Sequence, residues 1–501
     1  MRSIYFMLSF AIVLMINHTL KGQESFEIFI DSQEDCFLQH ANSDDQGNII
    51  LVGGIGGFNF DYDAFIMKVY PNGEFITNRF DLGDTVSIFS TIDILDNGNY
   101  FVTGCYNTET VQSNRDHLWV AILDEDLNLV DQKSYLIREP YVGFAANAYS
   151  IIDNEGNVVV TTSGINPDSE AKVQFTDFAF YKFNQNGDTL LSRYYSFIHD
   201  EFPLNLTKMP GSDNLMLIER CTVYNNNVEL MQLDPQLNII STHRLGGPFD
   251  RLQGSPSSDY WVSDTELLVS GQRNWDTGSK DELAIGVQRV DTSGIMLQEL
   301  LLDKPDTTEY PAWRNSMACA NDSTIYIGGF QSYGELWSTT PAIAYLYMID
   351  KDMNLVGYKE LGGKYYQQVI GIIATHDDGC LVYALRFSTT EYERDIQIWK
   401  VSRDDMSIIT QVTDSKDQEM EIMIYPNPAS DRVFIQLPQS IPWTGLSLSI
   451  YNLEGKKVFQ KLITQPGNLL EAKITNLKPG YYIVSIDNNN QNIFTTKILK
   501  R

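Results

Sequence analysis

The feature that most constrains this chain is a unit of 51 to 58 residues that recurs seven times. Each unit contains a tight turn rich in Asp, Asn and Gly, a buried strand, a variable loop, a second strand, another tight turn and a third strand. The first copy occupies residues 44–80, with its tight turns at 45–48 and 71–73. One turn residue marks each unit, at Gly47, Gly98, Gly156, Asn214, Thr265, Ser323 and Gly379.

A repeat of about fifty residues with several short strands is typical of a β-propeller, in which each repeat forms one blade. A fourth strand fits before each first turn, for example at residues 90–95 and 369–375. Residues 26–30 resemble an outermost strand, and we expect them to close the ring on the last blade beside residues 407–412. A β-helix has a much shorter repeat, and separate sandwiches would not keep one turn pattern. The sequence therefore predicts an all-β fold with a seven-bladed β-propeller.

The distribution of charge predicts a second domain. Residues 420–501 hold 9 of the 36 basic and 5 of the 65 acidic residues, and residues 1–23 hold 2 basic and no acidic residues. Residues 24–419 therefore hold 25 basic and 60 acidic residues, a net charge of −35 against +4 for the last segment. Such a step marks a domain boundary near residue 415. The acidic balance also argues against binding to nucleic acid, because phosphate contacts need a basic surface.

The first residues resemble a secretory signal peptide. Arg2 supplies a positive charge, and residues 4–16 form an apolar run that is too short to span a bilayer comfortably. No later segment is long and apolar enough to cross a membrane, so the mature protein is predicted to have no transmembrane helix. The predicted parts are a signal peptide at 1–23, the propeller at 24–412, a polar linker at 413–421 and a C-terminal domain at 422–501.

The last eighty residues contain short strands about ten residues apart, which predicts a small Ig-like β-sandwich. Four segments there read YPNPASD (425–431), LSIYNLEGKKV (448–458), ITNLKPGYYIVSI (474–486) and KILKR (497–501). In this order they resemble the type A C-terminal sorting domain of the type IX (Por) secretion system. The motif positions are Tyr425, Pro426, Asn427, Pro428, Asp431, Gly455, Leu477, Gly480 and Lys497.

This resemblance implies a route out of the cell and two partners. The signal peptide would carry the chain to the periplasm, and the C-terminal domain would direct it through the outer-membrane translocon. In that family a sortase-like peptidase usually removes the domain, here within residues 413–422, and the cargo is released or attached to the cell surface. The propeller region resembles uncharacterised repeat propellers only in its fold, which implies no ligand.

Candidate ligand-binding residues come from the long, varied loops, which gather on the propeller face opposite the tight turns. Exposed aromatic rings there could stack on a glycan or anchor a protein partner. Three tryptophans and two tyrosines fall in such loops of the fifth and sixth repeats: Trp275, Trp313, Trp337, Tyr310 and Tyr333. Packing between blades is the alternative role for these rings. Trp119 and Trp399 lie in strand runs and are predicted to be in the core.

Acidic residues give no clear metal site. The turns that begin at Asp124 and Asp350 start like calcium loops, but they lack the Gly at position six and the Glu at position twelve. A hairpin-turn role is therefore expected for both. A carboxylate also stands at or near the start of five third strands, where backbone capping is favoured over a cation ring around the axis. These residues are Asp63, Asp116, Asp177, Asp281 and Asp395.

The five cysteines form no CxxC pair, and we expect buried free thiols. A link between Cys36 and Cys380 would require the first and last repeats to touch. We predict no cofactor, no metal and no catalytic residue, because no HExxH, GxSxG, P-loop or Rossmann motif is present.

The leading hypothesis is an exported cell-surface or secreted propeller that binds an unknown glycan or protein. The alternatives are a secreted hydrolase or lyase acting on polysaccharide or peptide at the mouth of the propeller, and a structural adhesin. A polar cluster containing a carboxyl group of shifted pKa would favour the enzyme, whereas an exposed aromatic patch without such a cluster would favour binding. A featureless rim would favour the structural role.

Overall fold

The chain forms two compact units, Met1–Ile409 and Thr410–Arg501. The computed structural model describes residues 25–31, 34–57, 61–82, 86–106, 117–137, 148–164, 177–195, 201–221, 227–245, 252–276, 281–302, 308–331, 340–388, 393–408, 423–425, 429–436, 446–452, 455–462, 469–488 and 491–501. The predicted signal peptide and linker lie outside these residues. Among the residues described, no helix is long and apolar enough to cross a membrane.

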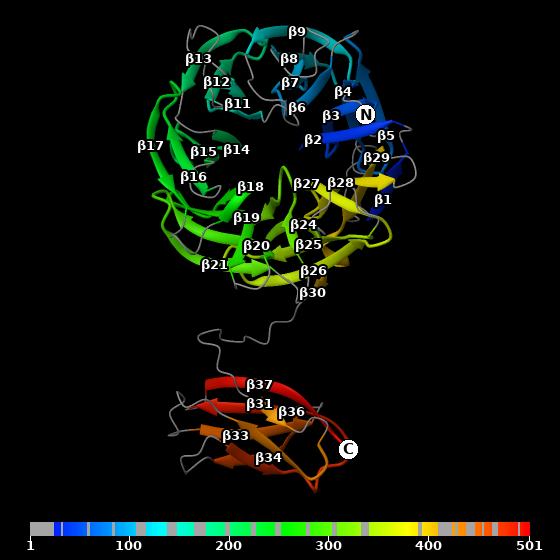
Figure 1. Cartoon of the computed structure of the whole chain (residues 1–501), viewed down its shortest axis with the longest axis vertical. Helices are drawn as coiled ribbons and strands as arrows, with labels where there is room; N and C mark the ends of the chain where they lie inside the picture. The colour runs from blue at the N-terminus through cyan, green and yellow to red at the C-terminus, as the bar shows by residue number, and fades with distance from the viewer. Residues whose placement is uncertain are drawn as a thin grey trace, which may run out of the picture. The chain divides into compact units, whose positions relative to one another are not determined.

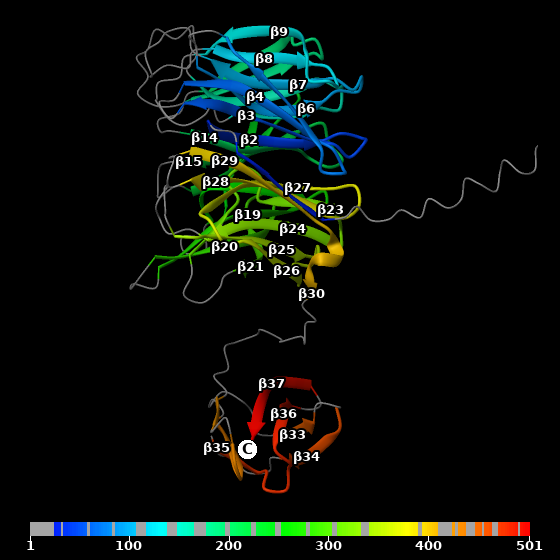
Figure 2. The ribbon, with the colours of Figure 1, turned by 90° about the vertical axis from the view of Figure 1, so that its right-hand side faces the viewer.

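The first unit is a ring of antiparallel sheets, the arrangement of a β-propeller (Figure 1). The inner strands of the ring include β2 (Asp35–Ser43), β6 (Ser87–Ile94), β14 (Glu201–Lys208), β18 (Leu252–Trp261) and β27 (Gln367–Ala374). The outer strands include β9 (Leu129–Leu136), β13 (Thr189–Tyr195), β17 (Ile239–Arg244), β21 (Met296–Leu302) and β26 (Leu355–Gly362). Figure 2 shows the ring from the side, with the strands of successive sheets stacked above one another. The all-β propeller prediction is therefore confirmed.

Three four-stranded sheets come first. They are β2 (Asp35–Ser43), β3 (Ile49–Gly57), β4 (Asp61–Val69) and β5 (Phe75–Phe80); β6 (Ser87–Ile94), β7 (Tyr100–Tyr106), β8 (His117–Leu123) and β9 (Leu129–Leu136); and β10 (Tyr149–Ile152), β11 (Val158–Gly164), β12 (Asp177–Phe183) and β13 (Thr189–Tyr195). In each of them the strands pair in chain order.

The next eight strands form one sheet. They are β14 (Glu201–Lys208), β15 (Leu215–Cys221), β16 (Asn227–Leu233), β17 (Ile239–Arg244), β18 (Leu252–Trp261), β19 (Glu266–Asp276), β20 (Asp281–Asp291) and β21 (Met296–Leu302). The two halves meet through one residue pair, Asn227 with Gln253. Counting these halves as two blades would give the predicted total of seven, and the blade number itself stays a prediction.

The ring ends with two further sheets. The first contains β22 (Glu309–Pro311), β23 (Met317–Asn321), β24 (Thr324–Gln331), β25 (Ile343–Ile349), β26 (Leu355–Gly362) and β30 (Ser407–Ile408), and the second contains β27 (Gln367–Ala374), β28 (Cys380–Ser388), β29 (Glu393–Val401) and β1 (Phe26–Ile30). The N-terminal strand β1 thus supplies the outermost strand of the last sheet, from the pair Phe26–Lys400 to the pair Ile30–Ile396.

One detail of this closure was predicted wrongly. Residues 407–412 were expected beside β1, but β30 pairs with β26 of the neighbouring sheet. The 3-10 helix η1 (Arg403–Asp405) follows β29, and the buried Met406 then packs in the core that includes that neighbouring sheet. Because burial of the Met406 side chain in this core is favourable, it directs the chain toward β26 rather than β1.

The loop predicted around Trp275 is also shorter than expected. Strand β19 continues to Asp276, so Trp275 lies in a strand opposite Glu282. The reason is that the antiparallel ladder between β19 and β20 remains paired out to Asp276 and Asp281. Sequence alone did not show how far that pairing extends.

The core lies between successive sheets. Strands β7 and β8 are buried on both faces, whereas the outer strand β5 alternates between partly buried and exposed residues. This is expected where both faces of a blade are covered by its neighbours. Trp119 and Trp399 are buried, as predicted. Among the described residues, Cys36, Cys105 and Cys380 are buried and form no disulfide, as expected, whereas Cys319 forms no disulfide but is only partly buried.

The second unit consists of two antiparallel sheets. One contains β31 (Met423–Tyr425), β32 (Arg432–Gln436) and β35 (Leu469–Lys473), and the other contains β33 (Leu446–Asn452), β34 (Lys457–Leu462), β36 (Gly480–Asn488) and β37 (Gln491–Lys500). Val433 and Ile435 from the first sheet share one apolar core with Leu448 and Val484 from the second. This is the small β-sandwich that the strand spacing predicts.

Candidate functional site

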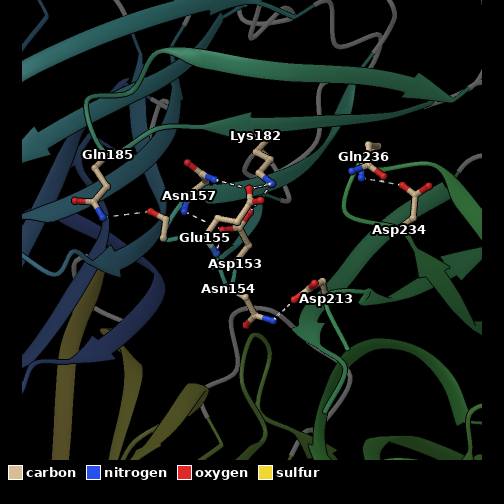
Figure 3. Close-up of polar contacts among 10 residues, drawn as sticks. Asp153, Asn154, Glu155, Asn157, Lys182, Gln185, Asp213, Asp234 and Gln236 are labelled. Atoms are coloured by element: carbon tan, nitrogen blue, oxygen red, sulfur yellow. Dashed lines mark hydrogen bonds and ion pairs between the residues drawn. The ribbon is translucent and has the colours of Figure 1, made fainter. Parts of the chain in front are cut away.

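The tight turns contain acidic side chains that form hydrogen bonds and ion pairs with nearby residues. In the turn after β10, Asp153 Oδ1 accepts the backbone N–H groups of Glu155 and Asn157, each at 2.9 Å (Figure 3). Lys182 Nζ lies 2.7 Å from Asp153 Oδ2 and 2.9 Å from Glu155 Oε2. Burial would raise the pKa of Asp153, but the bonds from Lys182 and the backbone outweigh burial and lower it.

Pairs of a lysine with an aspartate of the first turn recur in other sheets. Lys400 Nζ lies 2.7 Å from Asp377 Oδ2, and Lys68 Nζ lies 3.9 Å from Asp44 Oδ2. In each case the aspartate lies in the first turn and the lysine near the end of the third strand. These carboxylates therefore fix the hairpins in place.

The two turns that resemble calcium loops have the same construction. Asp124 Oδ1 accepts the backbone N–H groups of Asp126 and Asn128, at 3.0 and 2.8 Å. Asp350 Oδ1 accepts two backbone N–H groups in the same way. Among the described residues, no group of three His, Cys, Asp or Glu side chains could hold a metal ion.

The acidic residues predicted near third-strand starts are seen only in part. Asp63 Oδ2 lies 2.6 Å from Arg79 Nε, and Asp395 is buried. Asp116 lies outside the described residues, and only the backbone is described for Asp177 and Asp281.

A buried ion pair joins the first and last sheets. Arg394 on β29 donates from Nε to Asp35 Oδ1 on β2 at 2.8 Å, and from Nη2 to Asp35 Oδ2 at 2.5 Å. Tyr62 donates its hydroxyl proton to the same Asp35 carboxylate and accepts from Arg394 Nη2 at 2.8 Å. Burial is the largest cause that raises the pKa of Tyr62. This bidentate arrangement ties the ring closed beside β1.

The inner edges of the sheets face the axis of the ring and have backbone groups without a ladder partner. Neighbouring sheets supply these partners, as edge groups require. On β6, Ile92 N–H donates to His40 Nδ1 at 3.4 Å, and Ile92 O accepts from Asn42 Nδ2 at 3.2 Å. Bulges interrupt the inner strands at Gln39 and Ser90, so these residues leave the ladder.

The segment between β22 and β23 supplies hydrogen-bond partners to backbone groups on the inner edge of β27. Trp313 N–H donates to Val369 O at 3.1 Å, and Arg314 N–H donates to Ile370 O at 2.7 Å. Asn315 then forms a parallel bridge with Gly371. Residues 313–315 are therefore fixed against the last sheet by their backbone, and Asn315 Nδ2 also donates to Ile372 O at 2.8 Å.

The Arg314 side chain reaches two sheets distant in sequence. Its Nη2 donates to Gln39 Oε1 on β2, and its Nη1 donates to the Tyr149 hydroxyl on β10 at 3.1 Å. Its charge also acts on His40 and Tyr383. We call Gln39, His40, Tyr149, Arg314 and Tyr383 the axial cluster.

Every described partner in the axial cluster is neutral. Burial, helped by the charge of Arg314, lowers the pKa of His40 to about 4, so its ring is uncharged near pH 7. Because Nδ1 accepts from Ile92, the proton of this neutral ring resides on Nε2. Burial raises the pKa of Tyr383, so that hydroxyl is also neutral. The cluster therefore has one positive charge and several hydrogen-bond donors.

Two buried carboxyl groups on inner strands have raised pKa values. Burial raises the pKa of Asp93 to about 6 and that of Asp259 to about 7. Asn205 Nδ2 donates to Asp259 Oδ1, and Ser150 hydrogen-bonds to Asp93. The two carboxyl groups lie on β6 and β18, which are in different sheets.

The aromatic residues proposed from sequence do not form one described patch. Trp313 is 39% exposed, whereas Tyr310 stacks on Phe330 and packs against the core. Only the backbone of Trp275 is described, and Trp337 and Tyr333 lie outside the described residues. Sequence reasoning missed Arg314, which has no motif around it and meets its partners only because the ring brings distant repeats together.

The sorting-motif residues lie mainly at turns and strand ends. Gly455 has a φ of +76° in a turn, Leu477 packs against the sandwich core, and Gly480 begins β36. Asp431 is exposed, and the Lys497 ammonium lies 4.0 Å from the centre of the Tyr481 ring. Tyr425 ends β31, and Pro426, Asn427 and Pro428 lie outside the described residues.

Residues 423–501 match the family of secretion system C-terminal sorting domains. This type IX sorting domain indicates that the protein is exported and is attached to, or released from, the outer cell surface. It also implies an interaction with the secretion machinery. A search of curated proteins finds no match to the chain.

Solved structures with a related arrangement have low identity. A polysaccharide lyase of family PL25, an ulvan lyase, is 12% identical with a TM-score of 0.46, covering 77% of this chain and 98% of its own. A fungal alcohol oxidase of the AA5 family in complex with copper is 10% identical with a TM-score of 0.42, covering 95% and 98%. An α-L-arabinanase from Penicillium chrysogenum is 10% identical with a TM-score of 0.38, covering 63% and 93%.

Proposed function

We propose that this chain is a surface or secreted binding protein, in which a sorting domain exports a β-propeller that holds an extracellular ligand. The observation that carries the binding role is the segment 313–315. The backbone of this segment is fixed against β27. Within the segment, the Trp313 side chain is exposed, and the Arg314 side chain extends toward β2 and β10. A fixed backbone that presents an aromatic ring and a cation is suited to recognition.

The export route that we propose has a specific order. A signal peptide at residues 1–23 directs the chain to the periplasm, and the sorting domain then engages the outer-membrane translocon. A sortase-like peptidase cuts within residues 413–422, and the propeller at residues 24–412 stays outside the cell. The ligand is a glycan or a protein, and Trp313 is the first of the candidate aromatic residues to test. Trp275, Trp337, Tyr310 and Tyr333 are the remaining candidates.

A secreted hydrolase or lyase is the second candidate function, favoured by the raised pKa values of Asp93 and Asp259. Asp93 accepts from Ser150 on β10 of another sheet, whereas Asp259 accepts from Asn205 on β14 of its own eight-stranded sheet. Among the described residues, the two carboxyl groups have separate polar partners and no contact joins them, so they do not form a catalytic pair here. The binding function is therefore better supported.

The export proposal is tested by mass spectrometry of supernatant, surface and periplasmic fractions of the native host. The full-length gene should give an extracellular protein that ends near residue 420, and a gene lacking residues 423–501 should leave the protein in the periplasm. Equal export of both forms would contradict the proposal, and the C-terminal sandwich would then be a candidate binding domain.

A further inference from the structure

The axial cluster contains a positive charge that no described negative charge balances. Arg314 has five N–H donors, and its bonds to Gln39 and Tyr149 use two of them. Within the parts of the chain that the structure describes, no carboxylate lies at ion-pair distance from Arg314. The propeller region is strongly acidic, so a shortage of acidic residues does not explain this.

A second observation points to a missing partner at the same place. Gln39 Oε1 accepts from Arg314, which leaves Gln39 Nε2 as a donor with no partner among the described residues. Gln39 is fully buried, at 0% exposed, and the hydroxyl of the buried Tyr383 also lacks a described partner. A buried polar group without a partner costs about 1–3 kcal/mol. An acceptor that filled this place would satisfy these donors.

We propose that the axial cluster binds the oxyanion of a small acidic ligand, a carboxylate or a sulfate, with Arg314 as its main contact. A planar guanidinium presents parallel N–H groups that fit two oxygens of such a group. Gln39 Nε2 and the Tyr383 hydroxyl are the additional donors. This inference rests on the proposed binding function and names the chemistry of its ligand.

A purely structural role for Arg314 explains less. The bonds to Gln39 and Tyr149 would tie β2 and β10 to the segment 313–315, as a structural role requires. Such a role leaves the charge of Arg314 without a counter-charge and the amide of Gln39 without an acceptor. Arg394, by contrast, has a counter-charge in Asp35, whose two carboxylate oxygens accept its hydrogen bonds.

The test uses the purified full chain and three probes in low-chloride buffer: D-glucuronate, inorganic sulfate and neutral D-glucose. Isothermal titration calorimetry should detect binding of at least one anion to the wild type and no binding of glucose. Arg314→Gln removes the guanidinium and should weaken anion binding about 10- to 100-fold, the effect of losing charge-assisted hydrogen bonds. Arg244→Gln is the matched control, because Arg244 pairs with Glu229 on an outer strand.

Binding of glucuronate alone would assign the site to a carboxylate-bearing ligand, and binding of sulfate alone to a sulfate source. The inference is overturned if neither anion binds the wild type, or if Arg314→Gln binds as tightly as the wild type. If that variant does not fold, Arg314→Lys keeps the charge without the planar fork, and unchanged binding by it would also overturn the inference. Failure here leaves the export result unaffected, because the host fractions test export separately.

Discussion

Charged side chains have counter-charges at the tight turns of the propeller, but the charge at its axis has none among the described residues. At the turns, Asp153 meets Lys182 and Asp377 meets Lys400, and each carboxylate also accepts local hydrogen bonds. At the axis, Arg314 meets only neutral described partners. The charges at the turns are matched within their own sheet, and Arg394 is matched by Asp35 from another sheet, whereas Arg314 contacts other sheets without a described counter-charge. The difference separates a structural network from a site that is open to a ligand.

The largest expected effect comes from breaking a matched pair that joins two sheets. Asp35→Ala would leave Arg394 buried without its carboxylate, which typically costs about 3–5 kcal/mol of the free energy of unfolding. Urea denaturation followed by fluorescence would measure this loss. The double variant Asp35→Leu with Arg394→Met is the control, and it should recover much of the stability because no charge is then buried alone. Equal loss in both variants would show that the ion pair itself is not the cause.

The second prediction concerns the buried carboxyl group of Asp259, which lies on an inner strand and not in a tight turn. The pKa of Asp259 is raised to about 7, so the folded state keeps its proton in a range where the unfolded chain has lost it. Stability from this group is full below about pH 4 and is lost as the pH rises through about 7. Asp259→Asn cannot ionise and should remove about 2–4 kcal/mol of this pH dependence.

The measurement is the free energy of unfolding of Asp259→Asn and the wild type at several pH values from 4 to 8. The variant should gain stability relative to the wild type as the pH rises, and the gain should level off above about pH 7. Asn keeps an oxygen to accept from Asn205, so the bond between the two strands remains. A difference that is constant over this range would contradict the raised pKa.

The sequence was sufficient to predict structural features that depend on residues within one repeat. The turn residues Asp44 to Asn48 and the apolar runs on either side predicted hairpins that the structure contains, and the motif from Tyr425 predicted the sorting domain. These features depend on residues that are close together in the chain, where turn chemistry and strand periodicity act directly.

The sequence was not sufficient to predict contacts that form only when the ring closes and brings distant repeats together. Arg314 is 275 residues from Gln39 and 165 from Tyr149, and no local pattern encodes their meeting. The bulge that displaces Gln39 from its ladder is likewise a property of the paired strands. The pairing of β30 with β26, and the place of Trp275 in a strand, follow from side-chain burial and pairing length. These are tertiary effects that single-repeat reasoning does not contain.

The third prediction tests the turn network directly. Lys182→Met would remove the ammonium that both Asp153 and Glu155 contact, and it should lower the free energy of unfolding by about 1–3 kcal/mol. Lys133→Met is the matched control, because Lys133 pairs with Asp188 at an exposed position, where an ion pair contributes little to stability. Equal effects of the two variants would mean that burial does not strengthen the turn pairs.

The smallest effect on stability is expected at the axis. Arg314→Gln loses two hydrogen bonds, which are worth about 1 kcal/mol each, but it also removes a partly buried charge that has no described counter-charge. These contributions oppose each other, so the free energy of unfolding without ligand should change by less than about 1 kcal/mol. The same variant should lose the stabilisation that a bound oxyanion gives to the wild type. If Arg314→Gln instead destabilises the unliganded protein as much as Lys182→Met does, Arg314 belongs to the structural network, and the contrast between turns and axis is wrong.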